Sequence, residues 1–290
     1  MTTITLNDRI SQKTAVAAGI FDGFHCGHGL VIREACNYGL IPAVFTFRSE
    51  SVKFKHGKPF EYIYTNSQKL HCFEKAGVEY VLSPDFDEIK DMTGEEFAEK
   101  VLCGSMNAGT VVCGDNFRFG KNASCSVDEL KVFGEKYGFS VEAVKLREND
   151  FSSEKFRTML KNGELSEKSP YILYGEVVHG KQIGRTINFP TLNQNYADGQ
   201  LVPKYGVYFT RTRVDGTLYN SITNVGIKPT IVGKRTPLAE THILDFSGDL
   251  YGRNIEVEFC KFIRPEMKFP SVDELRKQIS EDIAAVRSFM

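Results

Sequence analysis

The stretch Thr14–Gly39, TAVAAGIFDGFHCGHGLVIREACNYG, decides the fold of the first half of the chain. Residues 14–21 form an almost continuous apolar run, which is typical of a buried strand. A glycine-rich turn follows, and residues 28–38 then carry apolar side chains at helical spacing and end before a glycine. A strand, a tight turn and a helix in this order predict the first unit of a parallel α/β sheet.

The alternation of short apolar runs with helix-like segments continues to residue 162. The predicted strands are residues 14–21, 41–47, 79–83, 110–114 and 139–146, and the predicted helices are residues 28–38, 66–76, 93–103, 126–137 and 152–162. Thr93 and Ser126 each stand three residues before a glutamate, which is the spacing of a capping box at a helix N-terminus. This rhythm predicts βαβ units, a mainly parallel sheet and helices on both of its faces.

The second half of the chain has a different pattern. Residues 163–170, GELSEKSP, are polar and carry Gly and Pro, which is typical of a linker. The strand-like segments beyond it are residues 171–178, 206–214, 217–225, 240–246 and 255–263, and a helical pattern returns only in residues 271–290. We therefore expect an α/β plus all-β chain, with a Rossmann-like domain at 1–162 and a small β-barrel with a terminal helix packed outside it at 163–290.

Length and composition suit a soluble protein with two domains. The chain has 290 residues and a formal net charge of −1, so we expect neither nucleic acid nor a membrane as a partner. The polar N-terminus lacks a signal-peptide pattern, and no apolar run approaches the roughly 20 residues that span a bilayer. Seven scattered cysteines without a CxxC pair fit reduced thiols better than disulfides. These features predict a cytoplasmic protein and leave its oligomeric state open.

The segment Phe21–His28, FDGFHCGH, is the first candidate site. It follows a predicted strand and opens a predicted helix, and open α/β sheets bind ligands at this edge. Gly23 and Gly27 would let backbone N–H groups approach a phosphate, and His25 and His28 add side-chain donors. The alternatives are a purely structural turn and a zinc site, which would need a third and a fourth ligand. With no P-loop and no GxGxxG pattern in the chain, phosphate binding by this turn is the interpretation we favour.

Three motifs in the first half resemble one enzyme family. GIFDGFHCGH at 19–28 is similar to the HxGH motif of the nucleotidyltransferase superfamily, in the form used by the prokaryotic bifunctional riboflavin kinase/FAD synthetases. CGDNFRFGKNAS at 113–124 and FSSEKFR at 151–157 resemble the second and third motifs of that family, in the same order. The resemblance spans residues 14–160 and implies FMN adenylyltransferase activity, in which the phosphate of FMN attacks ATP and pyrophosphate leaves.

The resemblance also implies roles for individual residues. His25 and His28 would be catalytic, binding the ATP phosphates and stabilising the transition state. Asn116 and Arg118 would approach the nucleotide or the flavin phosphate, and the next helix would begin with two serines near the outer phosphates. The complete set of nucleotide contacts implied here is Gly19, Phe21, Asp22, Gly23, Gly27, Asn116, Arg118, Ser152, Ser153 and Arg157.

The first half also departs from the family pattern. Asp150 and Glu154 are acidic positions beside the proposed polyphosphate, where the family has a basic residue and a threonine. The family often shows a His-Pro pair where this chain has FRSES at 47–51, and Cys125 replaces a usual glycine. These departures keep a kinase with a degenerate N-terminal domain as the alternative.

The second half carries a longer signature. GEVVHGKQIGRTINFPTLN at 175–193 closely resembles the riboflavin kinase signature, and residues 224–231, 240–252 and 262–275 match further segments of that family in order. The resemblance spans residues 165–290. It implies a barrel of riboflavin kinase type that transfers phosphate from ATP to the 5′-hydroxyl of riboflavin.

Each requirement of that reaction has a candidate residue. Glu240 would be the catalytic base for the hydroxyl, and Thr191 and Asn193 offer the hard oxygen donors that Mg²⁺ prefers. The loop 180–186 would cover the phosphates. The implied substrate contacts are Gly180, Gly184, Arg185, Thr191, Asn193, Tyr251 and Arg264.

Plainer interpretations accompany these roles. Thr191 and Asn193 also suit a turn after a proline, and Glu240 also suits the surface of a strand. An apolar slot for the flavin ring would come from residues such as Leu250, Tyr251 and Phe269, although Tyr251 equally suits core packing. His242 shares a strand face with Glu240, and we expect it to be structural.

The leading hypothesis is a bifunctional enzyme that uses riboflavin, FMN and ATP as substrates and Mg²⁺ as cofactor. The alternatives are the kinase alone and a non-catalytic flavin-nucleotide sensor, because a fold does not prove an activity. The joint presence of Thr191, Asn193 and Glu240 argues against the sensor, which needs neither a base nor a metal site.

Overall fold

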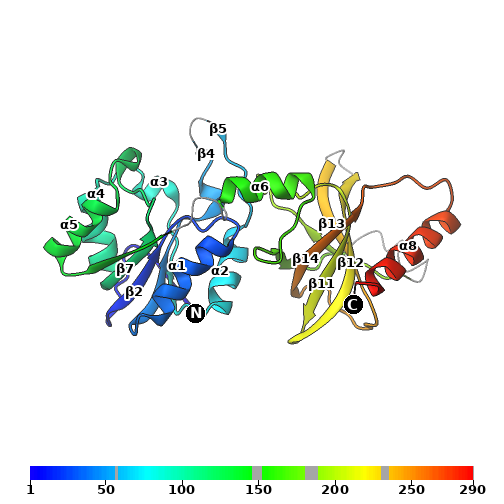
Figure 1. Ribbon diagram of the computed structural model, residues 1–290, viewed down its shortest axis with the longest axis horizontal. Coiled ribbons are helices and arrows are strands. Elements are labelled where there is room, and N and C mark those ends of the chain that lie inside the picture. Colours follow the sequence, from blue (N-terminus) through cyan, green and yellow to red (C-terminus); the bar gives the residue numbers. More distant parts are fainter. Residues whose placement is uncertain (56–57, 146–151, 180–188, 230–234, 290) are drawn as a thin grey trace. The chain divides into compact units, whose positions relative to one another are not determined.

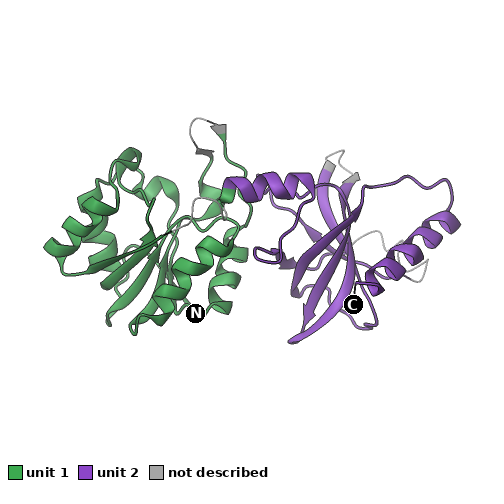
Figure 2. Ribbon diagram, viewed as in Figure 1, with its two compact units in different colours: residues 1–153 green, residues 154–290 purple. Residues whose placement is uncertain are grey.

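The computed structural model describes residues 1–55, 58–145, 152–179, 189–229 and 235–289. The chain divides into two compact units, residues 1–153 and 154–290 (Figure 2). The sequence predicts the domain boundary after residue 162, at the end of helix α6 (Ser153–Asn162), whereas the structure divides the chain at the start of this helix. Most of α6 belongs to the second unit, where the backbone N–H of Lys204 donates to Leu160 O at 2.9 Å.

The first unit contains a six-stranded sheet in which every neighbouring pair is parallel. The strands in spatial order are β1 (Thr2–Ile4), β6 (Tyr80–Leu82), β3 (Ile41–Phe45), β2 (Thr14–Ala18), β7 (Ala108–Gly114) and β8 (Ser140–Val144). The predicted parallel α/β sheet is therefore confirmed. The sequence did not predict β1, because three residues in a polar segment give no apolar run.

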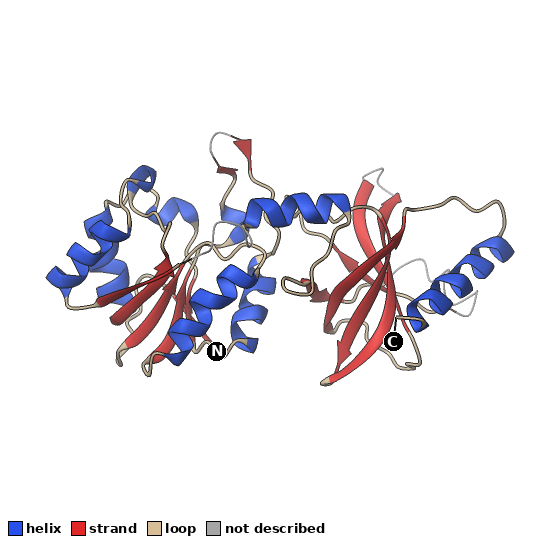
Figure 3. Cartoon of the chain, in the orientation of Figure 1, coloured by secondary structure: helices blue, strands red, loops and turns tan. Residues whose placement is uncertain are grey.

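Both faces of this sheet are covered by helices (Figures 1 and 3). Ala15 and Ala17 of β2 pack with α1 (Cys26–Asn37) and α2 (Asn66–Lys75), while Val16 on the opposite face packs with the remaining long helices. Those helices are α4 (Gly94–Glu96), which continues as a π-helix (Phe97–Ser105), and α5 (Val127–Tyr137). A strand buried on both faces needs an unbroken apolar run, and β2 has one.

The shorter elements lie around the loops of the first unit. They are a 3₁₀ turn (Ser49–Ser51), the hairpin β4 (Phe54–Lys55) and β5 (Lys58–Pro59), helix α3 (Phe86–Ile89) and a second 3₁₀ turn (Lys121–Ala123). The capping boxes predicted at Thr93 and Ser126 are both formed.

The strand order creates a switch point between β2 and β7. From β2 the chain proceeds to β3 and β6 on one side and then returns to β7 on the other. The carboxyl ends of β2 and β7 therefore adjoin each other, and the loops that leave them begin at one edge of the sheet. Open α/β sheets bind their ligands at this edge.

The second unit is an antiparallel barrel with six strands. In spatial order they are β10 (Leu192–Asn195), β13 (Arg235–Ile243), β12 (Thr217–Pro229), β11 (Gly206–Val214), β14 (Asn254–Arg264) and β9 (Tyr171–Glu176). A bridge between Val178 and Asn193 closes the sheet, and Gln194 Nε2 donates to Gly175 O at 2.9 Å across the closure. The predicted barrel is confirmed, whereas the polar sequence of β10 did not predict a strand.

The interior of the barrel is partly polar. Tyr171 and Tyr208 pack edge-on against Phe259, with ring centroids 5.1 Å apart in each pair. Beside them, five buried hydroxyl groups follow one another at 2.8 Å in the order Thr212, Ser221, Thr210, Thr223 and Thr241. These hydrogen bonds join β11, β12 and β13 and so help to set the register of the three strands.

Helix α8 (Val272–Arg287) packs on the outside of the barrel, as the sequence predicted (Figure 1). Ile283 and the fully buried Val286 contact a cluster formed by Val207, Phe209 and Ile222. Within the described ranges, no helix combines the length and the apolar content needed to cross a membrane.

Gly134 in α5 tests how closely the chain leaving this helix passes over its last turns. A Cβ at this position would lie 2.5 Å from the carbonyl oxygen of Phe139, so Gly134→Ala should destabilise the protein by roughly 1–3 kcal/mol, as overpacking does. Urea denaturation of the full chain measures the change. Gly29→Ala in α1 is the control, because its Cβ would meet nothing within 4 Å and should raise stability by about 0.5–1 kcal/mol. Equal effects of the two changes would contradict the packing described here.

Candidate active sites

The loop between β2 and α1 has an irregular backbone that is held by buried contacts. Phe21, Gly23 and Phe24 have φ values of 51°, 86° and 45°, which cost energy at the two phenylalanines. The Asp22 carboxylate, 2% exposed, accepts hydrogen bonds from the backbone N–H groups of Ile63 (2.7 Å) and Tyr64 (3.2 Å). The loop therefore takes its shape from contacts with a distant segment of the chain.

His25 and His28 lie face to face at the start of α1. Their ring centroids are 3.6 Å apart with an interplanar angle of 25°. Burial lowers the pKa of His25 to about 4, and burial, aided by the charges of His25 and Lys69, lowers the pKa of His28 well below its usual value. Both rings are therefore neutral at pH 7, which lets them stack without repulsion.

Both histidines also have a buried nitrogen with no hydrogen-bond partner among the described residues, Nδ1 in each ring. His25 is the N-cap residue of α1 but its side chain makes no capping bond. The N-terminus of α1 thus offers backbone N–H groups beside two ring nitrogens, which is the donor set that an anion such as phosphate requires. For the zinc alternative, the described part of the chain contains no group of three or more His, Cys, Asp or Glu side chains suited to a metal.

Other predicted nucleotide contacts gather at the same edge of the sheet. Asn116 and Arg118 are exposed in the turn directly after β7. Ser152 directly precedes α6, and Ser153 Oγ donates to the carbonyl oxygen of Asp22 at 2.9 Å. The hydroxyl of the third motif is thereby tied to the backbone of the first motif.

The remaining predicted positions of this site are two glycines and two acidic residues. A Cβ on Gly19 would lie 3.0 Å from the ring of Phe21, and Gly27 is buried in the first turn of α1. In the second unit, the exposed Glu154 carboxylate lies 3.2 Å from Nη1 of the buried Arg157. Part of the acidic charge that departs from the family pattern is therefore balanced within α6. Asp150 lies outside the described residues.

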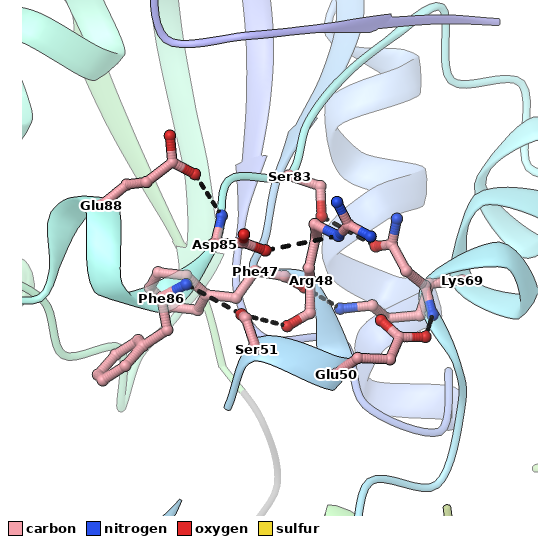
Figure 4. Close-up of polar contacts among 10 residues, drawn as sticks. Phe47, Arg48, Glu50, Ser51, Lys69, Ser83, Asp85, Phe86 and Glu88 are labelled. Atoms are coloured by element: carbon pink, nitrogen blue, oxygen red, sulfur yellow. Dashed lines mark hydrogen bonds and ion pairs between the residues drawn. The ribbon is translucent and has the colours of Figure 1, made fainter. Parts of the chain in front are cut away.

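A charged hollow opens where β3 and β6 end, beside the 47–51 segment that lacks the family's His-Pro pair (Figure 4). It has a volume of about 490 Å³ and is lined by Arg48, Glu50, Ser51, Lys53, Asp85, Asp87 and Glu88. Arg48 Nε lies 3.5 Å from Asp85 Oδ1, and Ser51 Oγ accepts from the backbone N–H of Phe86 at 2.9 Å. Lys69 is not among the residues that line this hollow, and its Nζ donates to the backbone carbonyl oxygen of Phe47 (Figure 4).

The second candidate site is a row of side chains across three strands of the barrel. Glu240 on β13 is the register partner of Asn193 on β10 and of Asn224 on β12. Register partners project from the same face of a sheet, about 5 Å apart, so the predicted base lies between two amides. Asn193 is 3% exposed, and its Oδ1 has no hydrogen-bond partner among the described residues.

Thr191 is held beside this row by its neighbours in the chain. His242, two residues beyond Glu240 on β13, has its Nδ1 2.8 Å from the carbonyl oxygen of Pro190. Because a carbonyl oxygen only accepts, the proton must be on Nδ1. The ring of Phe189 packs edge-on against His242 at 5.6 Å. The sequence predicts a structural role for His242, and this hydrogen bond gives it one: His242 anchors the segment that carries Thr191.

The predicted flavin contacts fall into two groups. Arg264 at the end of β14 binds the buried Asp282 of α8 with two nitrogens, at 3.0 Å from Nε and 2.8 Å from Nη2, and its guanidinium carbon lies 5.9 Å from the ring of Phe269. Tyr251 stacks on His179 with ring centroids 3.9 Å apart, and the preceding Leu250 is buried. Gly180, Gly184 and Arg185 lie outside the described residues.

The sequence interpretation missed several residues that the structure brings to these sites. They are Lys69, Asn224, His242 as an anchor, and Asp282. A signal existed for Lys69, since it falls at helical spacing with the apolar Cys72 and Phe73. No local signal marks Asn224, whose position depends on strand register.

Comparisons with known proteins assign one family to each half of the chain. Residues 7–155 match the family model described as FAD synthetase, and residues 167–290 match riboflavin kinase. A bifunctional riboflavin kinase/FMN adenylyltransferase from Haemophilus influenzae is 35% identical over 97% of this chain and 96% of its own length. The Bacillus subtilis enzyme of the same description is 33% identical over 93% of this chain and 90% of its own.

A solved structure extends this likeness to the fold of the whole chain. It is a Streptococcus pneumoniae protein described as a macrolide-efflux protein, with a TM-score of 0.80, 28% identity and 99% coverage of both chains. Two domain families matched in order, and relatives matched along nearly their entire length, lead to one conclusion. This chain belongs to the family of bifunctional riboflavin kinase/FMN adenylyltransferases.

Proposed function

We propose that the chain phosphorylates riboflavin to FMN in its barrel and adenylylates FMN to FAD at the parallel sheet, with ATP as the second substrate of both reactions. One observation carries the assignment to residues. Buried polar atoms without a hydrogen-bond partner, among the described residues, include His25 Nδ1, His28 Nδ1 and Asn193 Oδ1. Such atoms are costly unless a ligand satisfies them, and these three belong to the motifs of the two reactions.

In the kinase reaction, Glu240 would accept the proton of the riboflavin 5′-hydroxyl. The freed oxygen would then attack the γ-phosphorus of ATP, and the bond to the bridging oxygen would break to release ADP. Asn193 and Asn224 flank Glu240 across the sheet, so their amides can orient its carboxylate. The strand register thus supplies the positioning that phosphoryl transfer depends on.

The residues around Glu240 fit a magnesium ion. Asn193 Oδ1 is a buried, unpartnered oxygen, and the Thr191 hydroxyl follows Pro190, whose carbonyl is fixed by His242. Hard oxygen donors that are few in number suit Mg²⁺, which retains several waters. When bound, the ion would neutralise charge on the phosphates of ATP.

In the adenylyl transfer, an FMN phosphate oxygen would attack the α-phosphorus of ATP and pyrophosphate would leave. The neutral His25 and His28 and the N-terminus of α1 would hold phosphate oxygens by donating hydrogen bonds. Asn116, Arg118 and Ser152 lie on the loops of the same sheet edge. They are our candidates for the remaining nucleotide contacts.

The setting we propose is the cytoplasm. All seven cysteines lie in described residues and no two of them form a disulfide, as in a reducing compartment. We propose small-molecule substrates and no nucleic-acid partner, in line with the net charge of −1.

The proposed function is tested by incubating the purified protein with riboflavin, ATP and Mg²⁺ and separating the flavins. Formation of FMN and then FAD is the expected outcome. Accumulation of FMN without FAD would support the kinase-only alternative, and no FMN at all would leave the non-catalytic sensor.

Substitutions should separate the two reactions. Glu240→Gln removes the base and should reduce FMN formation from riboflavin at least about 100-fold, while conversion of added FMN to FAD continues at the normal rate. His28→Ala should have the opposite effect, with a loss of about 100-fold in adenylylation. Both rates are measured by flavin chromatography on each variant. Loss of both activities in a folded variant would contradict one reaction per domain.

His242 should act on the kinase reaction through the segment 189–191. His242→Leu removes the bond to Pro190 O, which is worth roughly 1–1.5 kcal/mol, and should raise the KM for magnesium-ATP about tenfold. His242→Asn is the matched variant, because its amide N–H takes the place of Nδ1 and should restore most of the affinity. Steady-state kinetics of FMN formation compare the two. The same KM for both would show that the hydrogen bond does not matter.

A further inference from the structure

Lys69 is a buried cation that neither the sequence motifs nor the reactions above account for. Its side chain is 1% exposed, and it extends from α2 into the carboxyl edge of the parallel sheet (Figure 4). The ammonium group donates to Ile20 O at 3.3 Å, to Thr46 Oγ1 at 3.2 Å and to Phe47 O. These acceptors belong to the loops that follow β2 and β3, on either side of the nucleotide-binding edge.

The hydrogen bonds of Lys69 among the described residues all go to neutral oxygens. A buried ammonium is expensive without a counter-charge in direct contact. The carboxylates of Asp22 and Glu50 act on it only as more distant charges, and burial lowers the pKa of Lys69 to about 8 against their effect. Among the described residues, no carboxylate therefore makes a direct hydrogen bond to this ammonium group.

The charge of Lys69 reaches the histidine pair. It contributes to the lowering of the His28 pKa, so Lys69 adds a positive contribution to the potential at this ring. A polyphosphate at His25 and His28 would bring negative charge into that potential. In a site with few waters such an interaction is far stronger than at the surface.

We propose that Lys69 is a positioning residue of the adenylyl transfer. It fixes the backbone at Ile20 and Phe47 and supplies positive charge beneath the phosphate site without touching the substrate. This inference rests on the proposed function of the N-terminal domain. It adds a residue from α2, outside all three motifs, to the machinery of that reaction.

The first test compares Lys69→Met with the wild type. Methionine matches the length of lysine but has neither the charge nor the donors, so kcat/KM for ATP in FMN adenylylation should fall by roughly tenfold or more. The kinase rate of the same preparation, measured with riboflavin, should be unchanged, but it reports only on the barrel. Far-UV circular dichroism and urea denaturation matching the wild type therefore have to show that the unit carrying Lys69 is folded. Lys75→Met, at the exposed end of the same helix, is the matched control and should leave both rates unchanged. Adenylylation within twofold of the wild type in Lys69→Met would overturn the proposal.

The second test is the pH profile of the wild type, which needs no variant. The pKa of Lys69 is lowered toward about 8, so the ammonium loses its proton as the pH rises through that value. The kcat/KM for ATP reports groups of the free enzyme and should fall above pH 8, levelling off near the loss seen in Lys69→Met. The carboxylates of Asp22 and Glu50 act on Lys69, and Lys69 in turn acts on His28, whose pKa is lowered well below its usual value by burial. A flat profile from pH 7 to pH 9.5 would overturn the proposal even if Lys69→Met does not fold.

Lys69→Arg tests whether the positive charge of Lys69 matters, beyond its hydrogen bonds to the loops after β2 and β3. Its guanidinium keeps the charge at all accessible pH values, so the fall above pH 8 should disappear in this variant. A fall that persists would assign the titration to another group and remove the electrostatic part of the proposal. Absence of FAD formation by the wild type would instead contradict the proposed function itself, so the two failures are distinguishable.

Discussion

Where a chain leaves a buried strand, its peptide N–H and C=O groups no longer have partners in the sheet and need other hydrogen bonds. At the end of β2 this requirement falls on Ile20, whose carbonyl oxygen accepts from Thr46 Oγ1 at 2.8 Å and from Lys69 Nζ. The next residues adopt positive φ angles, which cost energy. The hydrogen bonds that Asp22 accepts from the backbone of Ile63 and Tyr64 stabilise this conformation. The histidine pair and the start of α1 follow directly. The geometry of the nucleotide site thus depends on satisfying a few buried peptide groups.

The two sites obtain their precision in different ways. In the parallel sheet, the functional groups lie on loops, and buried side chains such as Asp22 and Lys69 hold those loops from behind. In the barrel, Asn193 and Glu240 lie on paired strands, so the sheet register itself sets their separation. The first arrangement can change by small loop movements. The second arrangement can change only if the strands pair in a new register, which involves the whole sheet.

The sequence predicted the architecture well because the relevant signals are local. Buried strands such as β2 and capping boxes at Thr93 and Ser126 appear in short windows of sequence, and the domain families follow from compact motifs. The polar strand β10 and the three-residue β1 carry no such pattern. Long-range pairing creates them. The same reason explains why Asn224 was missed, since its position depends on a distant strand. The burial of Lys69 had a local signal in the helical spacing, but its hydrogen-bond partners lie far away in the chain.

The row of hydroxyl groups inside the barrel has a consequence for how its core tolerates change. Each hydroxyl between the ends, Ser221, Thr210 and Thr223, lies at 2.8 Å from two others. Each group has a single proton to donate, so the most favourable arrangement turns all the O–H bonds in one sense along the row. The row then carries a directional dipole that ends at Thr241 on β13. Replacing Thr210, the central member, by the isosteric valine would divide this dipole into two independent pairs, each free to reverse, although the shape of the core would hardly change.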